Sequence, residues 1–169
     1  MIFESIQQMK KELVQVDKWL DLAVTYAKDK SFEPSVLLES RLAPDQFPLV
    51  RQIQISCDTL KFALGKLTGK EMPSHADEEK TVEDIKARIA KVIALVDGLT
   101  AKDFANAETI TVTAPRWEGK WMIGKDYFLE HSTPNFYFHV VTTYAILRHN
   151  GVNVGKRDYL GQMSLRDPK

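Results

Sequence analysis

Two residues on different predicted helices have side chains suited to acid–base chemistry. His139 lies in the middle of an apolar segment near the C-terminal end, and Asp58 lies in an earlier amphipathic segment. An aspartate beside an imidazole raises its pKa and orients it, which prepares the imidazole for proton transfer. If the two helix faces meet, the sequence predicts Asp58 and His139 as a catalytic pair.

His139 has three interpretations on sequence alone. An isolated histidine within a helix is commonly a buried group that hydrogen-bonds to a neighbouring helix. It can also be a pocket residue that works without a metal, or a metal ligand together with Asp58. A protein metal site usually needs three protein ligands. No cofactor is therefore predicted, and a divalent metal would need carboxylate ligands beside His139.

Four further residues are candidates for contact with a substrate. Gln54 lies one helical turn before the candidate aspartate and shares its helix face. Phe136 and Tyr144 lie in the same segment as the candidate histidine. Arg41 precedes the second predicted helix, where it can bind a carboxylate or phosphate group or form a local salt bridge.

Four amphipathic segments are expected to position these residues. Helices are predicted over residues 2–28, 45–67, 81–98 and 134–149, because apolar side chains recur there at three- and four-residue steps. Ser132 or Thr133 is the expected N-cap of the last helix, with Pro134 in its first turn. Gly151 is expected to end that helix in a left-handed conformation. A long extended connection is predicted between the first two helices.

A short hairpin is predicted before the last helix. Residues 108–113 alternate threonine with apolar side chains, which is typical of a half-buried strand. Residues 117–124 can pair back onto that strand. Because an isolated two-stranded hairpin is marginally stable in water, Trp117 and Trp121 are expected to anchor it to the helices.

The composition favours a single ordinary globular domain. A chain of 169 residues with 44% hydrophobic side chains fits one domain, expected over residues 1–163 with a frayed tail at 164–169. The 23 basic and 23 acidic side chains balance, which argues against nucleic-acid and membrane partners. The lone cysteine, Cys57, excludes an intrachain disulfide. With no secretory signal and no long apolar run, the expected location is cytoplasmic.

Several runs of this sequence resemble an uncharacterised family of the DinB-like superfamily. They are Arg41–Leu49, Pro134–His139, Tyr144–Gly151 and Gly155–Gly161, and the resemblance extends over nearly the whole chain. It implies an all-α, DinB-like four-helix bundle with a small β-hairpin insertion before the last helix. The resemblance also implies a homodimer. It does not imply any particular reaction.

The wider superfamily resembles metal-dependent enzymes, several of which act on low-molecular-weight thiols. Their divalent site takes one histidine from the second helix and a histidine pair, four residues apart, from the fourth. His139 matches one member of that pair, but the positions four residues before and after it are Asn135 and Thr143. The second helix contains no histidine. The ligand triad that the resemblance implies is therefore incomplete in this sequence.

Three functions remain open. The favoured one is a metal-poor relative of these enzymes that binds a small molecule in the bundle core, in a pocket lined by His139, Tyr144, Phe136 and Asp58. The second is a divalent-metal-dependent transferase or hydrolase that uses His139 with carboxylate ligands. The third is a non-enzymatic interaction module that forms a homodimer through apolar helix faces.

Overall fold

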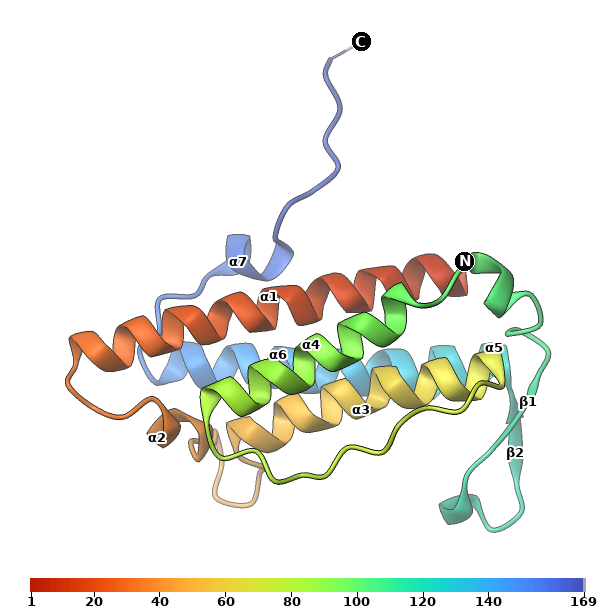
Figure 1. Cartoon of the computed structure of the whole chain (residues 1–169), viewed down its shortest axis with the longest axis horizontal. Coiled ribbons are helices and arrows are strands. Elements are labelled where there is room, and N and C mark those ends of the chain that lie inside the picture. Colours follow the sequence, from red (N-terminus) through yellow and green to blue (C-terminus); the bar gives the residue numbers. More distant parts are fainter. Residues whose placement is uncertain (169) are drawn as a thin grey trace.

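The computed structural model describes residues 1–168 and contains four long helices that lie side by side (Figure 1). They are α1 (Ile2–Asp29), α3 (Leu49–Thr68), α4 (Val82–Asp97) and α6 (Thr133–His149). α6 packs most extensively on α3, while α1 contacts both α4 and α6. Their apolar faces form one core, in which Trp19 and Phe136 are among the largest fully buried side chains. The predicted helical bundle is confirmed.

α3 begins later than the sequence indicated. The helix starts at Leu49, and Pro48 is its extended N-cap, with φ −69° and ψ 167°. A proline disfavours the helical conformation of the residue before it, so Phe47 cannot continue a helix into α3. The prediction of a start near Asp45 was therefore wrong. The connection before it also contains a short helix, α2 (Ser35–Leu38), where an extended segment was expected.

The start of α6 also differs from the prediction. A short helix, α5 (Gly124–Asp126), and a π-helical segment, η3 (Tyr127–Ser132), run directly into α6. Ser132 is itself helical, with φ −65° and ψ −48°, and its side chain caps nothing. Pro134 lacks an N–H, and in a regular α-helix its ring would clash with the carbonyl group four residues back. The wider π-helical turns before Pro134 relieve this conflict, so the helix extends back to the hairpin.

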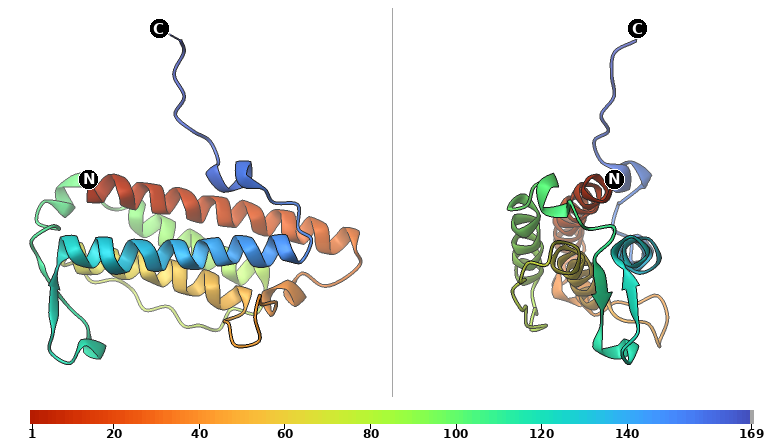
Figure 2. Two further views of the ribbon diagram at one scale, coloured as in Figure 1. Left: turned by 180° about the vertical axis from the view of Figure 1, so that it is seen from behind. Right: turned by 90° about the vertical axis from the view of Figure 1, so that its right-hand side faces the viewer.

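The hairpin lies at one end of the bundle and projects past α3 (Figures 1 and 2). β1 (Thr111–Thr113) pairs antiparallel with β2 (Trp121–Ile123), so the predicted hairpin before the last helix is confirmed. The strands are shorter than predicted, because residues 108–110 form turns and η2 (Pro115–Trp117) is a short 3₁₀ turn. A proline cannot donate a ladder hydrogen bond, which limits the length of β1.

The two tryptophans of the hairpin have different environments. Trp117 is half-buried and packs edge-on against Tyr127 of η3, with ring centroids 6.1 Å apart. Trp121 is 60% exposed, so its predicted role as an anchor was wrong. Trp117 therefore attaches the hairpin to the helical segment that leads into α6.

The chain ends on the outer side of α1. Gly151 follows α6 with φ +96°, as predicted, and a short helix, α7 (Lys156–Leu160), packs on α1. The Trp19 indole donates to the Asp158 carbonyl oxygen at 3.2 Å. Residues 164–168 are exposed and contain no helix or strand, and Lys169, part of the predicted frayed tail, lies outside the described residues. None of the described helices is long and apolar enough to cross a membrane.

Candidate functional site

His139 lies buried in the interface between α6 and α3. Its Nδ1 is 2.7 Å from Oε1 of Gln52, and Nε2 of Gln52 donates to the Phe47 carbonyl oxygen at 2.9 Å. This amide orientation makes Nδ1 the protonated nitrogen of the imidazole. Burial, together with the nearby charge of Arg51, lowers the pKa of His139 to about 4. The imidazole is therefore neutral at neutral pH and holds α6 against α3.

A second hydrogen bond crosses the same interface one turn earlier. Asn135 Nδ2 donates to the Thr59 hydroxyl at 2.7 Å, and that hydroxyl donates to the Ile55 carbonyl oxygen at 2.7 Å. The superfamily resemblance implies a metal ligand at His139 and a second one at position 135 or 143, which are Asn135 and Thr143 here. The α3 side chains bonded to Asn135 and His139 are a hydroxyl and an amide. Within residues 1–168, no three histidine, cysteine or acidic side chains lie close enough to hold a metal ion. The residues present do not fit a DinB-type metal centre.

Asp58 does not pair with His139, contrary to the catalytic pair that the sequence suggested. Its Oδ2 lies 2.8 Å from Arg88 Nη2, and its Oδ1 lies 2.9 Å from Lys61 Nζ. Its carboxylate is therefore held by Arg88 of α4 and by Lys61 of its own helix, rather than by the imidazole. The predicted rise of the His139 pKa was also wrong, since burial and the charge of Arg51 lower that pKa instead.

Asp58 belongs instead to a charged cluster around Arg88, which is only 2% exposed. Arg88 contacts Asp77 at 2.9 Å and Glu79 at 3.0 Å, so it fastens the loop between α3 and α4 to both helices. Gln54 donates to Glu79 at 2.8 Å and lies in this cluster rather than near His139. The cluster holds three basic and three acidic side chains: Arg51, Lys61, Arg88, Asp58, Asp77 and Glu79.

The three remaining predicted site residues lie apart from one another. Phe136 is fully buried in the core. Tyr144 packs against Trp19 and Tyr159 on the α1 side of α6, with ring centroids 5.8 and 6.0 Å away. Arg41 is exposed in the loop before α3. The predicted core pocket of His139, Tyr144, Phe136 and Asp58 does not form, and of all six candidates only Asp58 lines the main cavity.

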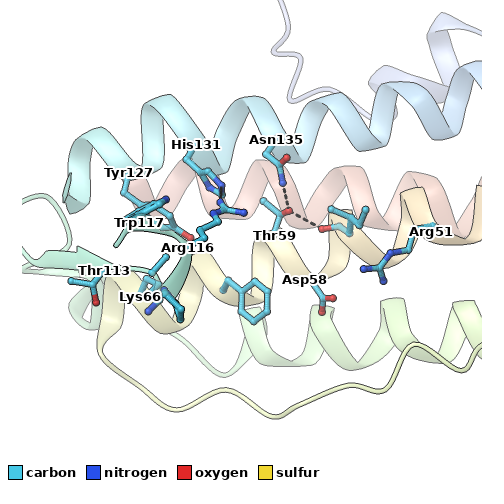
Figure 3. A pocket seen from close by; sticks show the side chains of 14 residues that line it. Arg51, Asp58, Thr59, Lys66, Thr113, Arg116, Trp117, Tyr127, His131 and Asn135 are labelled. Atoms are coloured by element: carbon cyan, nitrogen blue, oxygen red, sulfur yellow. Dashed lines mark hydrogen bonds between the residues drawn. The ribbon is translucent and has the colours of Figure 1, made fainter. Parts of the chain in front are cut away.

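That cavity, about 550 Å³ in volume, lies where the hairpin faces α3 and the start of α6 (Figure 3). We call it the hairpin pocket. α3 lines it with a row of side chains on one helix face: Arg51, Ile55, Asp58, Thr59, Phe62 and Lys66. The hairpin contributes residues 113–117, and the helical segment contributes Tyr127, His131 and Asn135 at four-residue spacing.

An aromatic wall closes the hairpin end of the pocket. The rings of Tyr127 and His131 stack, with centroids 5.4 Å apart and an angle of 14° between them, and Trp117 lies edge-on to both. Arg116 extends into the pocket beneath His131 and donates to its Nε2 (Figure 3). Burial and the Arg116 charge lower the pKa of His131. The wall therefore combines a neutral imidazole with an adjacent guanidinium group.

Sequence reasoning missed His131, Arg116 and Trp117 as pocket residues. It placed His131 before the last helix, where its side-chain direction could not be inferred. The useful signal was the four-residue spacing of Tyr127, His131 and Asn135, which puts them on one helix face if the helix continues through Pro134. The π-helical segment makes that continuation possible.

Comparison with known proteins relates both the sequence and the fold to one group. Residues 2–160 match the model of a domain of unknown function, DUF1993. A crystal structure of a DinB family member protein from Shewanella denitrificans superimposes with a TM-score of 0.94 at 47% sequence identity. The match covers 96% of this chain and 93% of that one, which confirms the predicted DinB-like fold. No curated protein matches the chain.

Proposed function

The chain belongs to DUF1993, a DinB-like family of domains of unknown function, and we propose that it binds a small organic molecule in the hairpin pocket without a metal ion. The hairpin pocket itself carries this proposal. Its volume of about 550 Å³ is in the usual range for small-molecule sites. Its lining also has the usual composition, with aromatic and aliphatic surface around a few polar groups.

The α3–α6 interface supports the metal-free part of this proposal. At one of the two positions where the superfamily resemblance implies a second ligand on α6, Asn135 donates to Thr59 of α3. Within residues 1–168, no three histidine, cysteine or acidic side chains lie close enough to hold a metal ion with His139 among them. A divalent-metal-dependent transferase or hydrolase would need carboxylates beside His139. The carboxylate that the sequence offered for this role, Asp58, is held by Lys61 and Arg88. We therefore favour binding over the metal-dependent alternative.

A pocket-filling substitution tests the binding proposal. Ile55 is half-buried in the α3 row of the pocket, so Ile55→Trp places an indole in the cavity. Leu22→Trp, at an exposed position on α1, is the matched control. Fragments found by ligand-observed NMR with the wild-type protein should bind Leu22→Trp and fail to bind Ile55→Trp. Equal binding to both folded variants would place the ligand elsewhere and contradict the proposal.

We also propose that the protein forms a homodimer through the outer face of α6. Phe138 and Val141 are 57% and 47% exposed, and Pro134 and Ala145 continue their row at helical spacing. A twofold axis would pair this row with itself in an isologous interface. Light scattering should give a dimer for the wild-type protein and for Val36→Glu, and a monomer for Phe138→Glu. A monomeric wild-type protein would contradict this proposal.

We also propose that the protein is located in the cytoplasm. Cys57 is a free thiol fully buried in the core, and the sequence has no second cysteine to form an intrachain disulfide. Burial raises the pKa of the Cys57 thiol to about 12, which keeps it protonated and unreactive. A lone buried thiol is typical of proteins of a reducing compartment.

A further inference from the structure

We propose that the ligand of the hairpin pocket is an organic anion whose acidic group binds Arg116 and whose apolar body lies on Phe62. The inference rests on the proposed binding function and specifies the class of ligand. Both residues line the cavity, and Arg116 points into it from the hairpin (Figure 3). The sign of the unopposed charge in the pocket and the shape of its apolar surface lead to this assignment.

Two of the charged α3 side chains that line the pocket already have partners. Arg51 pairs with Asp77, and Asp58 is held between Lys61 and Arg88. The charged cluster to which they belong has three positive and three negative side chains, as described above. A ligand that displaced one of these pairs would leave a charge without its partner, which is unfavourable in a partly buried site. The ligand is therefore expected to use other charged groups.

Arg116 and Lys66 are the pocket cations that remain. Within residues 1–168, neither forms an ion pair with a carboxylate. Arg116 donates from Nη2 to a neutral imidazole, so no described residue compensates its positive charge or occupies its other N–H groups, which can bind a ligand. A guanidinium group presents parallel N–H donors that match the two oxygens of a carboxylate or phosphate group. His131 thus orients Arg116 while leaving its charge available.

The apolar surface of the pocket requires more than a simple ion. Phe62 is 56% exposed although it is a large aromatic side chain, and it lines the cavity beside Ile55. Trp117 contributes a further aromatic surface from the hairpin. An apolar group placed between α3 and the hairpin would remove these side chains from water, which is favourable in proportion to the buried area. An inorganic anion would leave that surface exposed.

The same wall argues against a cationic ligand. Aromatic rings around a cavity can bind ammonium groups through cation–π interactions. Here the guanidinium of Arg116 already lies beneath the His131 ring, and Lys66 lines the same cavity. A second cation would be repelled by both, whereas an anion is attracted by both.

Calorimetric titration with matched pairs of compounds tests the inference. The probes are benzoate, 2-naphthoate and octanoate, each compared with its neutral primary amide, and 2-naphthyl phosphate as the phosphate arm. Because hydrogen bonds to charged groups are the stronger ones, at least one acid should bind at least about tenfold more tightly than its amide. Comparison of the naphthoate with the naphthyl phosphate tells which acidic group Arg116 prefers.

Two arginine variants show whether Arg116 causes the difference in affinity between an acid and its amide. Arg116→Gln should reduce the affinity for the preferred acid at least about tenfold and leave the affinity for its amide unchanged. Arg157→Gln, at an exposed position on α7, should change neither affinity. Equal loss of acid binding in both variants would indicate a general effect of net charge and overturn the assignment to Arg116.

The results separate this inference from the proposed function. If the amides bind as tightly as the acids, and Ile55→Trp abolishes both, the pocket binds small molecules but its ligand is not selected as an anion. In that case the inference is wrong and the proposed function holds. If no probe binds the wild-type protein at millimolar concentration, both are contradicted.

Discussion

The imidazole of His139 illustrates how the partner of a residue decides its role. A histidine at a superfamily ligand position has a glutamine opposite it, and Nδ1 donates to that amide. Within residues 1–168, no histidine, cysteine or acidic side chains lie close enough to complete a metal site with it. Its buried position lowers its pKa to about 4. The pKa of this histidine is therefore lower in the folded protein than in the unfolded chain. Such a difference makes the free energy of unfolding depend on pH.

Replacing His139 with glutamine should make stability less sensitive to mild acid. Between pH 6.5 and about 4, the unfolded wild-type chain binds a proton at this histidine and the folded protein does not. The contribution of His139 should therefore lower the wild-type free energy of unfolding by up to about 1.4 kcal/mol for each unit by which the pH falls through that window. His139→Gln lacks the group. Urea unfolding near pH 7 and pH 5 should show a smaller loss for the variant, and equal losses would contradict the assigned neutral imidazole.

Arg88 should be far more important for stability than an exposed arginine. Arg88→Met leaves Asp58, Asp77 and Glu79 without their shared cation, and removal of one partner of a buried ion pair typically costs about 3–5 kcal/mol. Arg148→Met, at an exposed position on α6, should change stability by less than about 0.5 kcal/mol. Denaturant unfolding measures both. Similar small effects would mean that the cluster is solvated rather than structural.

At the scale of elements, the helices were predictable and their junctions were not. Three- and four-residue spacing identified the buried faces of all four long helices. The third was predicted to begin at residue 81, and Thr81 is the N-cap of α4, where it accepts from the Asp84 N–H at 3.1 Å. The start of α3 was misplaced because the effect of Pro48 on its predecessor was not weighed. Periodicity also could not show the π-helical segment before Pro134, since that segment depends on how the helix accommodates a proline.

Gly124 joins the hairpin to the helical segment and should tolerate no side chain. A Cβ at this position would lie 1.9 Å from the Ala107 carbonyl oxygen and 2.9 Å from Ile110 Cγ2. Gly124→Ala should therefore cost about 1–3 kcal/mol and weaken ligand binding, because the hairpin must shift. Gly98→Ala, whose Cβ would meet only ordinary contacts at 3.6 Å, should be neutral or slightly stabilising. Thermal unfolding distinguishes them, and a neutral Gly124→Ala would contradict the packing described.

Shortening the hairpin should separate ligand binding from folding. Thr113 and Trp121 are register partners, so replacing residues 114–120 with Asn-Gly leaves a two-residue turn between paired positions. The variant loses Arg116 and Trp117 but keeps the helical core. Circular dichroism should show an intact bundle, while titration with the preferred probe should show no binding. Retained binding would mean that the hairpin is not part of the site.

On the scale of the whole molecule, the hairpin pocket combines residues from three distant stretches of sequence. α3, the hairpin and the start of α6 contribute to it, and only their packing brings Lys66, Arg116 and His131 around one cavity. Spacing along one helix predicts which residues share a face, but it does not tell which face meets the hairpin. Asp58 was predicted for a core pocket beside His139, and its cationic partners Lys61 and Arg88 remained unrecognised for the same reason.

The three tryptophans provide the most direct test that the hairpin pocket is the binding site. Trp117 lines the pocket, Trp121 is exposed on the hairpin, and Trp19 is buried beneath α7 on the other side of the molecule. Their indole N–H signals can be followed in ¹⁵N–¹H correlation spectra while the preferred organic anion is added. We predict a saturable shift that is largest at Trp117, smaller at Trp121 and absent at Trp19. No shift at Trp117 at a ligand concentration that saturates binding, or the largest shift at Trp19, would contradict the account.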